Sequence, residues 1–222
     1  SRGLGDVYKR QLADSEMVAF INAIKGHEYE AVYLVTLFTG MREGEVLGLT
    51  WDCVDFKSGA ITIKQQLQKV RGTGGEYILA PTKNGKSRIV APAKYVMQVL
   101  TKQRKTQNEQ RLKAGPAWSN PLDLVFTNSL GKNLCAQTVY LHFKKLAAEA
   151  GVPDARFHDL RHSYAVAALR SGDDIKTVQE NLGHHTAAFT LDTYAHVTDQ
   201  MRKESAKRMD SFIEGIQAAK KA

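Results

Sequence analysis

The sequence predicts an α+β protein that is mostly α-helical and contains a small three-stranded antiparallel sheet. Apolar residues recur every three or four positions over most of the chain, which is the spacing of amphipathic helices. Between residues 60 and 91 the pattern changes to short strand-like runs separated by turn residues. With 222 residues, the chain is also long enough to bury a substantial apolar core.

Three helices are expected before the sheet. The first begins at Asp14 or Ser15, residue types that favour the N-cap, and ends at Gly26. Residues 29–38 predict a second, more apolar helix, which Gly40 terminates. The third helix starts directly after this glycine, so Arg42 is expected at a helix start.

Three strands are expected in the sheet, over residues 60–68, 77–81 and 87–91. Asn84-Gly85 is a strong hairpin signal, so the second and third strands are expected to be joined by a tight turn that Lys83 flanks. The glycine-rich loop between the first two strands lacks the GxGxxG spacing and a following helix, which argues against a nucleotide-binding loop.

Further helices are predicted after the sheet, over residues 95–113, 136–150 and 200–219, with two more between residues 157 and 182. The helix predicted over residues 200–219 carries an apolar stripe made of Met209, Phe212, Ile213 and Ile216. No internal repeat or clear domain boundary is visible, so we expect a single domain.

Composition narrows the function. The chain carries 31 Lys and Arg against 23 Asp and Glu, a net charge of +8, which favours a polyanionic partner such as nucleic acid. Cys53 and Cys135 are isolated, which argues against a disulfide framework or a zinc ribbon and suits a reducing compartment. The sequence contains neither an apolar run long enough for a membrane span nor an apolar signal segment at its start.

Two histidines raise a metal hypothesis. His158 and His162 are four residues apart, the spacing at which two imidazoles on a helix can bind one zinc ion. The zincin motif needs a glutamate where this chain has Asp159, and Arg161 would place a fixed positive charge beside the cation. A role in capping or packing is the other alternative for these histidines.

Metal-free chemistry on a phosphodiester fits the residues better. Guanidinium groups must neutralise the charge that builds up on the phosphate oxygens, an acid must protonate the leaving oxygen, and a side chain must act as nucleophile. Tyrosine, whose ordinary pKa is about 10, would need cationic neighbours or a histidine acceptor to be activated. The candidates for these tasks are Arg42, Arg161, a hairpin lysine, His158, His184 and Tyr194.

Five motifs in one order carry a family resemblance: T-G-M-R-E-G-E-V-L-G-L, T-K-N-G-K, H-D-L-R-H-S, L-G-H-H and D-T-Y. Their order resembles the catalytic domain of the tyrosine recombinases, the phage integrase family. The motifs H-D-L-R-H-S and L-G-H-H further resemble those of integrases of bacterial phages and of integrative conjugative elements. The resemblance implies the tyrosine-recombinase catalytic fold and catalytic roles for Arg42, Lys83, His158, Arg161, His184 and Tyr194.

The resemblance also implies a mechanism. Tyr194 would attack the scissile phosphate and form a 3′-phosphotyrosine link, while Lys83 protonates the leaving 5′ oxygen. The reaction needs no metal, ATP or other cofactor, and family members act as homotetramers on double-stranded DNA, assisted in some cases by directionality or DNA-bending proteins. The expected setting is the bacterial cytoplasm, with a protein that is monomeric off DNA. Glu45 and Asp159 are expected to support the site without acting in the chemistry.

The organisation expected from this resemblance has three parts. Residues 1–11 are interpreted as a non-native or disordered leader, residues 12–199 as the catalytic domain, and residues 200–222 as a C-terminal helix and tail of the same domain. The family's usual N-terminal DNA-binding segments are not visible, which suggests a fragment. Two alternative functions stay open: DNA strand breakage like that of type IB topoisomerases, and a catalytically silent DNA-binding module.

Overall fold

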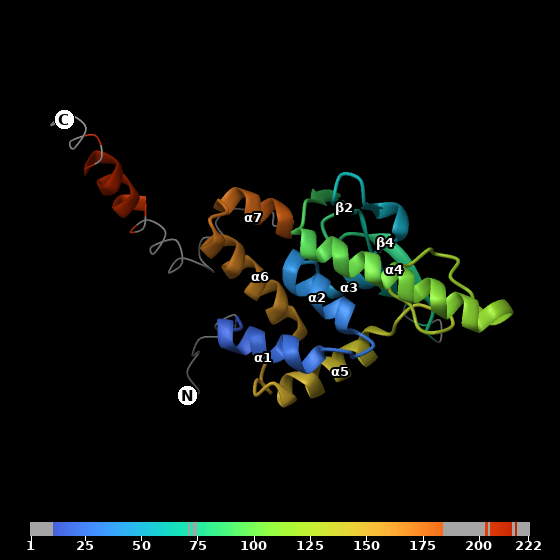
Figure 1. The fold of residues 1–222 in the computed structure, drawn as a ribbon. Helices are drawn as coiled ribbons and strands as arrows, with labels where there is room; N and C mark the ends of the chain where they lie inside the picture. Colours follow the sequence, from blue (N-terminus) through green and yellow to red (C-terminus); the bar gives the residue numbers. More distant parts are fainter. Residues whose placement is uncertain are drawn as a thin grey trace. The chain divides into compact units, whose positions relative to one another are not determined.

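The computed structural model describes residues 11–70, 72, 75–183, 203, 205–214 and 216. The chain divides into two compact units, residues 1–164 and residues 165–222, and the boundary falls inside one helix, α6 (Phe157–Ser171) (Figure 1). Each unit is described by itself.

The helices of the first unit confirm the predicted ones to within a few residues. Its α-helices are α1 (Asp14–Ile24), α2 (Glu30–Thr39), α3 (Glu43–Leu47), α4 (Lys94–Ala114) and α5 (Ala136–Glu149), followed by the start of α6. Two short 3₁₀ turns occur at Trp51–Cys53 and Gly115–Ala117. Ala13 is the N-cap of α1 where Asp14 or Ser15 was expected, so the helix starts at Asp14, earlier than predicted.

Among the described residues, five short strands form two antiparallel sheets where a single sheet was expected. The first sheet has the order β1-β2-β5 and contains Val54–Asp55, Ala60–Ile63 and Arg88–Val90. The second pairs β3 (Gln65–Lys69) with β4 (Tyr77–Pro81). The predicted strand over residues 60–68 is therefore two strands, which separate at Lys64.

The expected hairpin between the second and third predicted strands was wrong. β4 pairs with β3 and β5 pairs with β2, so the segment around Asn84-Gly85 connects two different sheets. The Thr82 hydroxyl donates to the carbonyl of Lys86, at 2.7 Å, and closes a loop that is longer than a two-residue hairpin turn. This extra length lets the chain leave one sheet and join the other.

The core of the first unit surrounds α2, whose side chains are buried on nearly every face. Tyr33 lies at its centre, in edge or tilted contact with the rings of Phe20, Phe143 and Phe157. The Tyr33 hydroxyl donates to the carbonyl of Val139 in α5, at 2.9 Å, which satisfies the polar group inside the core. Helix α2 is thus held rigidly, and so is the segment that follows it.

The second unit begins with residues 165–171 of α6 and continues with α7 (Ile175–Leu182). Asp174 caps α7 by accepting from the backbone N–H of Thr177. The predicted C-terminal helix is present among the described residues 203, 205–214 and 216, and its predicted apolar stripe is exposed, with 64% of Phe212 accessible. No helix in the described part of the chain is long and apolar enough to cross a membrane.

Candidate active site

The junction between α2 and α3 places Arg42. Helix α2 ends at Gly40, which adopts the left-handed conformation with φ 68°, a backbone geometry that glycine accepts without strain. Met41 is then buried, and Arg42 forms the N-cap of α3. The glycine turn predicted from the sequence therefore aims Arg42 from a fixed point of the backbone.

Glu45 holds Arg42 in place. Its carboxylate is fully buried and accepts from both the backbone N–H and the guanidinium of Arg42, each at 2.9 Å. Arg88 of β5 binds the same carboxylate with two nitrogens, at 3.0 and 2.7 Å. Burial acts to raise the pKa of Glu45, but the hydrogen bonds and charges of Arg88 and Arg42 lower it below its ordinary value. The expected supporting role of Glu45 thus has a structural basis.

Two glycines let α3 lie directly against strand β3. A Cβ atom on Gly48 would come within 2.4 Å of the backbone nitrogen of Leu67, and one on Gly44 within 3.3 Å of the Leu67 carbonyl oxygen. A larger residue at Gly48 would therefore push α3 away from the sheet, and Arg42 with it.

Arg161 lies on α6 and connects the H-D-L-R-H-S motif with the T-G-M-R-E-G-E motif. Its side chain is only 2% exposed, and one guanidinium nitrogen donates to the carbonyl oxygen of Gly40 at 2.5 Å. Asp159, also buried, accepts from the backbone N–H and the guanidinium of Arg156 and so orders the beginning of α6. The turn before Arg42 and the start of α6 are therefore joined through Arg161.

His158 lies one helical turn before Arg161. Desolvation, followed by the positive charge of Arg161, lowers the pKa of His158 below 6.5, with Arg42 and Arg156 contributing in the same direction. The imidazole is therefore mainly neutral near pH 7 and able to accept a proton. Its ring contacts that of His162 edge to face, with the centroids 4.7 Å apart.

Three of the six predicted catalytic residues line one cavity. This cavity has a volume of about 240 Å³. It is lined by Arg42, His158 and Arg161, together with Met41, Glu43, Tyr140, Arg156 and Phe157. Three guanidinium groups and a mainly neutral imidazole around a small open space are suited to binding a phosphate and moving a proton beside it.

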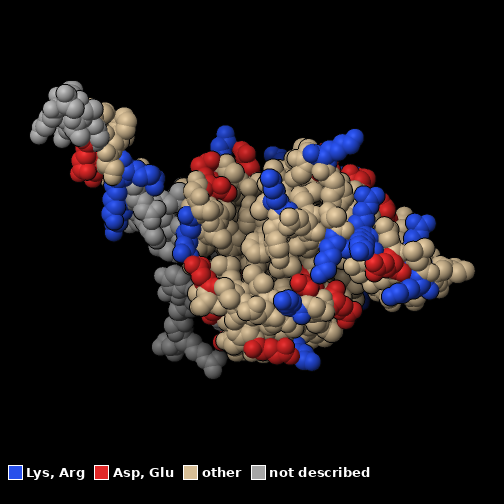
Figure 2. Space-filling model, viewed as in Figure 1, with Lys and Arg blue, Asp and Glu red and all other residues tan. Residues whose placement is uncertain are grey.

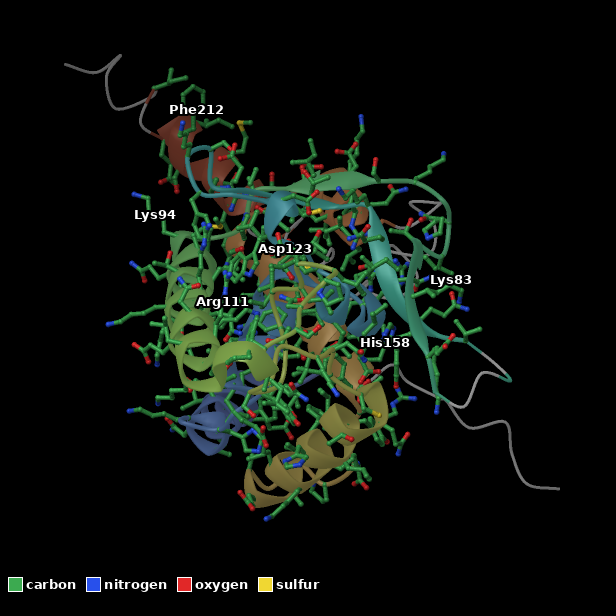
Figure 3. All side chains as sticks on the ribbon, turned by 90° about the vertical axis from the view of Figure 1, so that its right-hand side faces the viewer. Lys83, Lys94, Arg111, Asp123, His158 and Phe212 are labelled. Atoms are coloured by element: carbon green, nitrogen blue, oxygen red, sulfur yellow. The ribbon has the colours of Figure 1, made fainter. Side chains whose placement is uncertain are left out.

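The other three predicted catalytic residues, Lys83, His184 and Tyr194, are not among those that line this cavity in the described part of the chain. Lys83 lies on the exposed loop between β4 and β5, and in Figure 3 it projects on the same side of the first unit as His158. It is not among the residues that line the cavity. His184 and Tyr194 lie outside the described residues.

A comparison with protein families decides the relationship. The family model described as "Phage integrase family" matches residues 10–201. The chain belongs to this family. Its motif order, its α2–α3 turn with Arg42 and the H-D-L-R-H-S start of α6 are accordingly read as integrase features.

Curated relatives and solved structures agree with this assignment. A XerC-like tyrosine recombinase of Caldanaerobacter subterraneus subsp. tengcongensis is 32% identical over 212 residues, which covers 90% of this chain and 54% of the relative. The ICEBs1 integrase of Bacillus subtilis is 25% identical over 204 residues, covering 89% and 53%. The chain thus spans about half the length of the curated relatives it matches.

The fold is that of known integrase structures. A Tn1549 transposon integrase in complex with transposon right end DNA superposes with a TM-score of 0.76 at 20% identity, covering 93% of this chain and 68% of that one. XerH site-specific recombinase bound to a palindromic difH substrate gives 0.62 at 21% identity, covering 93% and 55%. The predicted tyrosine-recombinase fold is confirmed.

The sequence did not single out two residues of this region, Arg88 and Glu43. Arg88 lies two residues before the buried Val90 on a three-residue strand, so it shares the inward face, and an inward-facing arginine signals a buried acidic partner. Glu43 is the other carboxylate of the R-E-G-E segment, and only Glu45 had been given a role.

A different cluster could offer metal ligands. Among the described residues, His27, Glu28 and His142 bring one ligand atom each to within 4.8 Å of one another, and the two imidazoles approach to 3.0 Å. However, Nδ1 of His27 already accepts from the backbone N–H of Tyr29, which leaves the proton of neutral His27 on the nitrogen that faces His142. A hydrogen bond between the imidazoles fits this arrangement, and a metal would have to break the Tyr29 contact.

Proposed function

We propose that the chain is the catalytic domain of a site-specific DNA recombinase, an integrase that breaks and rejoins DNA strands through a 3′-phosphotyrosine intermediate. The observation that carries the proposal is the convergence of Arg42, His158 and Arg161 on one cavity. Membership of the phage integrase family supports it, and so does the DNA in the structures of the Tn1549 integrase and XerH.

The cleavage step uses the chain's own side chains. The Tyr194 oxygen bonds to phosphorus, the bond from phosphorus to the 5′ oxygen breaks, and Lys83 supplies the proton that the leaving oxygen takes up. Arg42 and Arg161 bind the non-bridging oxygens, on which negative charge increases in the transition state. His184 adds a hydrogen bond to the phosphate, while neutral His158 accepts the proton of the tyrosine.

Rejoining reverses this chemistry with another strand. A 5′ hydroxyl attacks the phosphotyrosine link, a new phosphodiester forms and the Tyr194 oxygen leaves, so the bond energy is conserved without ATP or a metal ion. The basic residues of α4, which carries six Lys or Arg and one acidic residue, are available to contact the DNA backbone. On the face shown in Figure 2, Lys and Arg side chains gather along this helix.

Assembly on DNA would involve four copies. The exposed stripe of the C-terminal helix, which includes Phe212 and Met209, offers an apolar face for a neighbouring copy on DNA, while the free chain is monomeric. We place the reaction in the bacterial cytoplasm, with residues 12–199 as the catalytic domain and residues 200–222 as its tail.

A covalent trap tests the chemistry. The chain is incubated with a pool of duplexes of randomised sequence, each nicked near the middle so that the short cleaved fragment diffuses away. The wild type should form a DNA adduct that survives denaturation, and Tyr194→Phe should form none. Tyr95→Phe, an exposed tyrosine on α4, is the matched control and should retain the adduct.

The two alternatives give different results in the same assay. A silent DNA-binding module would bind the duplexes but form no adduct in the wild type. An enzyme of the type IB topoisomerase kind would form the adduct and relax supercoiled plasmid, but it would not join strands of two different duplexes. Transfer of a labelled strand between duplexes is therefore the decisive readout for recombination.

A further inference from the structure

Glu43 and Glu45 are two residues apart but have opposite surroundings. Both oxygens of Glu45 accept hydrogen bonds from arginines. Glu43 instead lines the cavity beside Arg42, and its Oε1 is buried without a hydrogen-bond partner among the described residues. A buried polar atom on a residue that lines a cavity requires a partner from outside the described residues or a change of charge.

The arginines of the cavity do not neutralise Glu43. Arg42 donates to Glu45, Arg161 donates to the Gly40 carbonyl, and Arg156 donates to Asp159. Burial alone therefore dominates and raises the pKa of the Glu43 carboxyl to about 7. Near neutral pH a large fraction of the molecules carry a proton on this side chain.

The charge of Glu43 matters because the cavity has to accept an anion. An ionised carboxylate next to a phosphate would repel it, and the repulsion is strong where water is excluded. A neutral carboxylic acid adds no negative charge and can donate a hydrogen bond to a phosphate oxygen. Binding of a phosphate therefore favours the protonated form of Glu43.

On the basis of the proposed function, we propose that Glu43 enters the DNA complex as a neutral carboxylic acid and donates a hydrogen bond to a non-bridging oxygen of a backbone phosphate. When Glu43 starts ionised, the complex takes up one proton from solvent, and no bond of the DNA is broken in this step. Glu43 is thus a phosphate-binding residue whose charge sets the pH range of DNA binding.

The other charged groups around Glu43 titrate elsewhere or can be controlled. Arg42, Arg156 and Arg161 keep their charge throughout. The pKa of His158 is lowered from 6.5 and that of Tyr33 on α2, which faces Glu43 from the core, is raised above 10.0, so above pH 7 His158 is mainly neutral and Tyr33 is mainly protonated until pH 10. Tyr140 of α5 also lines the cavity, and Tyr140→Phe removes its phenol as a control.

Cys135 at the start of α5 needs a separate control, because the pKa of its thiol is also about 7. The experiment is therefore done in a Cys135→Ser background. Binding of a fluorescent duplex of random sequence, about 30 base pairs long, is measured by anisotropy at low, constant ionic strength. The pH is varied from about 6 to about 9, a range that brackets the ionisation of Glu43.

The affinity of the Cys135→Ser protein should weaken as the pH rises above 7, approaching about tenfold per pH unit, because one proton is linked to binding. Glu43→Gln stays neutral and keeps a donor, so its affinity should match the parent near pH 6 and stay constant above. Calorimetry in buffers of different ionisation enthalpy should show proton uptake near pH 8 for the parent and none for Glu43→Gln.

Each remaining outcome has a clear meaning. A slope that persists in Glu43→Gln, or no slope in the parent while Arg42→Gln weakens binding, overturns the role of Glu43 and leaves the proposed function intact. If Arg42→Gln and Arg161→Gln bind DNA as well as the parent at every pH, the cavity does not hold the phosphate, and both proposals fail. If Glu43→Gln loses its fold, as circular dichroism would show, the calorimetric proton count of the parent decides alone.

Discussion

Two parts of the candidate site are built in contrasting ways. The cleft floor, which is the start of α3 with Arg42, Glu45 and Arg88, is held together by the ion pairs of the two arginines with Glu45, a carboxylate that is inaccessible to solvent. The loop of residues 82–87, which carries Lys83 and which we call the rim, is mostly exposed. We infer that the groups proposed to bind the phosphate are preorganised by folding, whereas the exposed Lys83 can change its position when DNA binds.

Removing the central carboxylate of the cleft floor should have the largest effect. Glu45→Ala leaves Arg42 and Arg88 without their shared buried partner, which we expect to lower the free energy of unfolding by about 3–5 kcal/mol. Urea denaturation followed by circular dichroism measures this change.

The exposed pair of Lys64 with Asp52 is the control for that experiment. The two groups are 2.7 Å apart, but both side chains are largely accessible. Asp52→Ala should therefore change the free energy of unfolding by no more than about 1 kcal/mol. Equal losses in the two variants would mean that the cleft floor is no more preorganised than the surface.

Close packing of α3 on β3 predicts the next largest effect. Gly48→Ala would place a methyl group 2.4 Å from the backbone nitrogen of Leu67, so helix and strand must separate. We expect a loss of about 1–3 kcal/mol in the free energy of unfolding. Gly44→Ala, whose Cβ would lie 3.3 Å from its nearest neighbour, should lose less. If the two variants are equally stable, close packing does not fix the floor.

The difference between floor and rim also explains what the sequence could predict. Helices with clear apolar spacing, such as α1 and α5, were expected within a few residues because one buried face determines each of them. The pairing of β4 and β5 was wrong because strand partners depend on distant segments, here β2 and β3, which short-range turn signals do not report.

For the site, as for the fold, the sequence predicted the local features but not the contacts between distant segments. Arg42, His158 and Arg161 could be found because they sit in motifs at helix starts. The inward position of Arg88 signals a buried acidic partner, but the sequence could not show that this partner is Glu45, 43 residues earlier in the chain. The state of Glu43 depends on burial and on where three arginines point, neither of which a sequence motif specifies.

A cysteine that contacts the start of β4 offers a smaller, chemical test. Tyr77 of β4 donates to the Cys135 sulfur, at 3.4 Å, and this hydrogen bond, with backbone N–H groups of the first turn of α5, lowers the pKa of the thiol from 9.0 to about 7. Alkylation by iodoacetamide should therefore reach half its maximal rate near pH 7.

Tyr77→Phe should move that midpoint toward 9.0 while changing the free energy of unfolding by no more than about 1 kcal/mol, since a single exposed hydrogen bond is lost. Cys135→Ser is the control for labelling, because Cys53 is buried. A midpoint that stays near 7 in Tyr77→Phe would show that this contact does not tie β4 to α5.

Lys83 should give the smallest effect on stability and a large one on chemistry. Its side chain is exposed on the rim, so Lys83→Ala should change the free energy of unfolding by less than about 0.5 kcal/mol. Because Lys83 is the proposed general acid, however, Lys83→Ala should slow cleavage of intact duplex DNA by about 10²–10⁴-fold. Lys86→Ala removes another exposed lysine of the same loop; it is the matched control and should cleave like the wild type.

A substrate whose 5′ oxygen is replaced by sulfur, a leaving group that needs no proton, should restore cleavage by Lys83→Ala. Restoration separates proton donation from DNA binding, whereas a defect that persists with the sulfur substrate would make Lys83 a backbone contact of the rim.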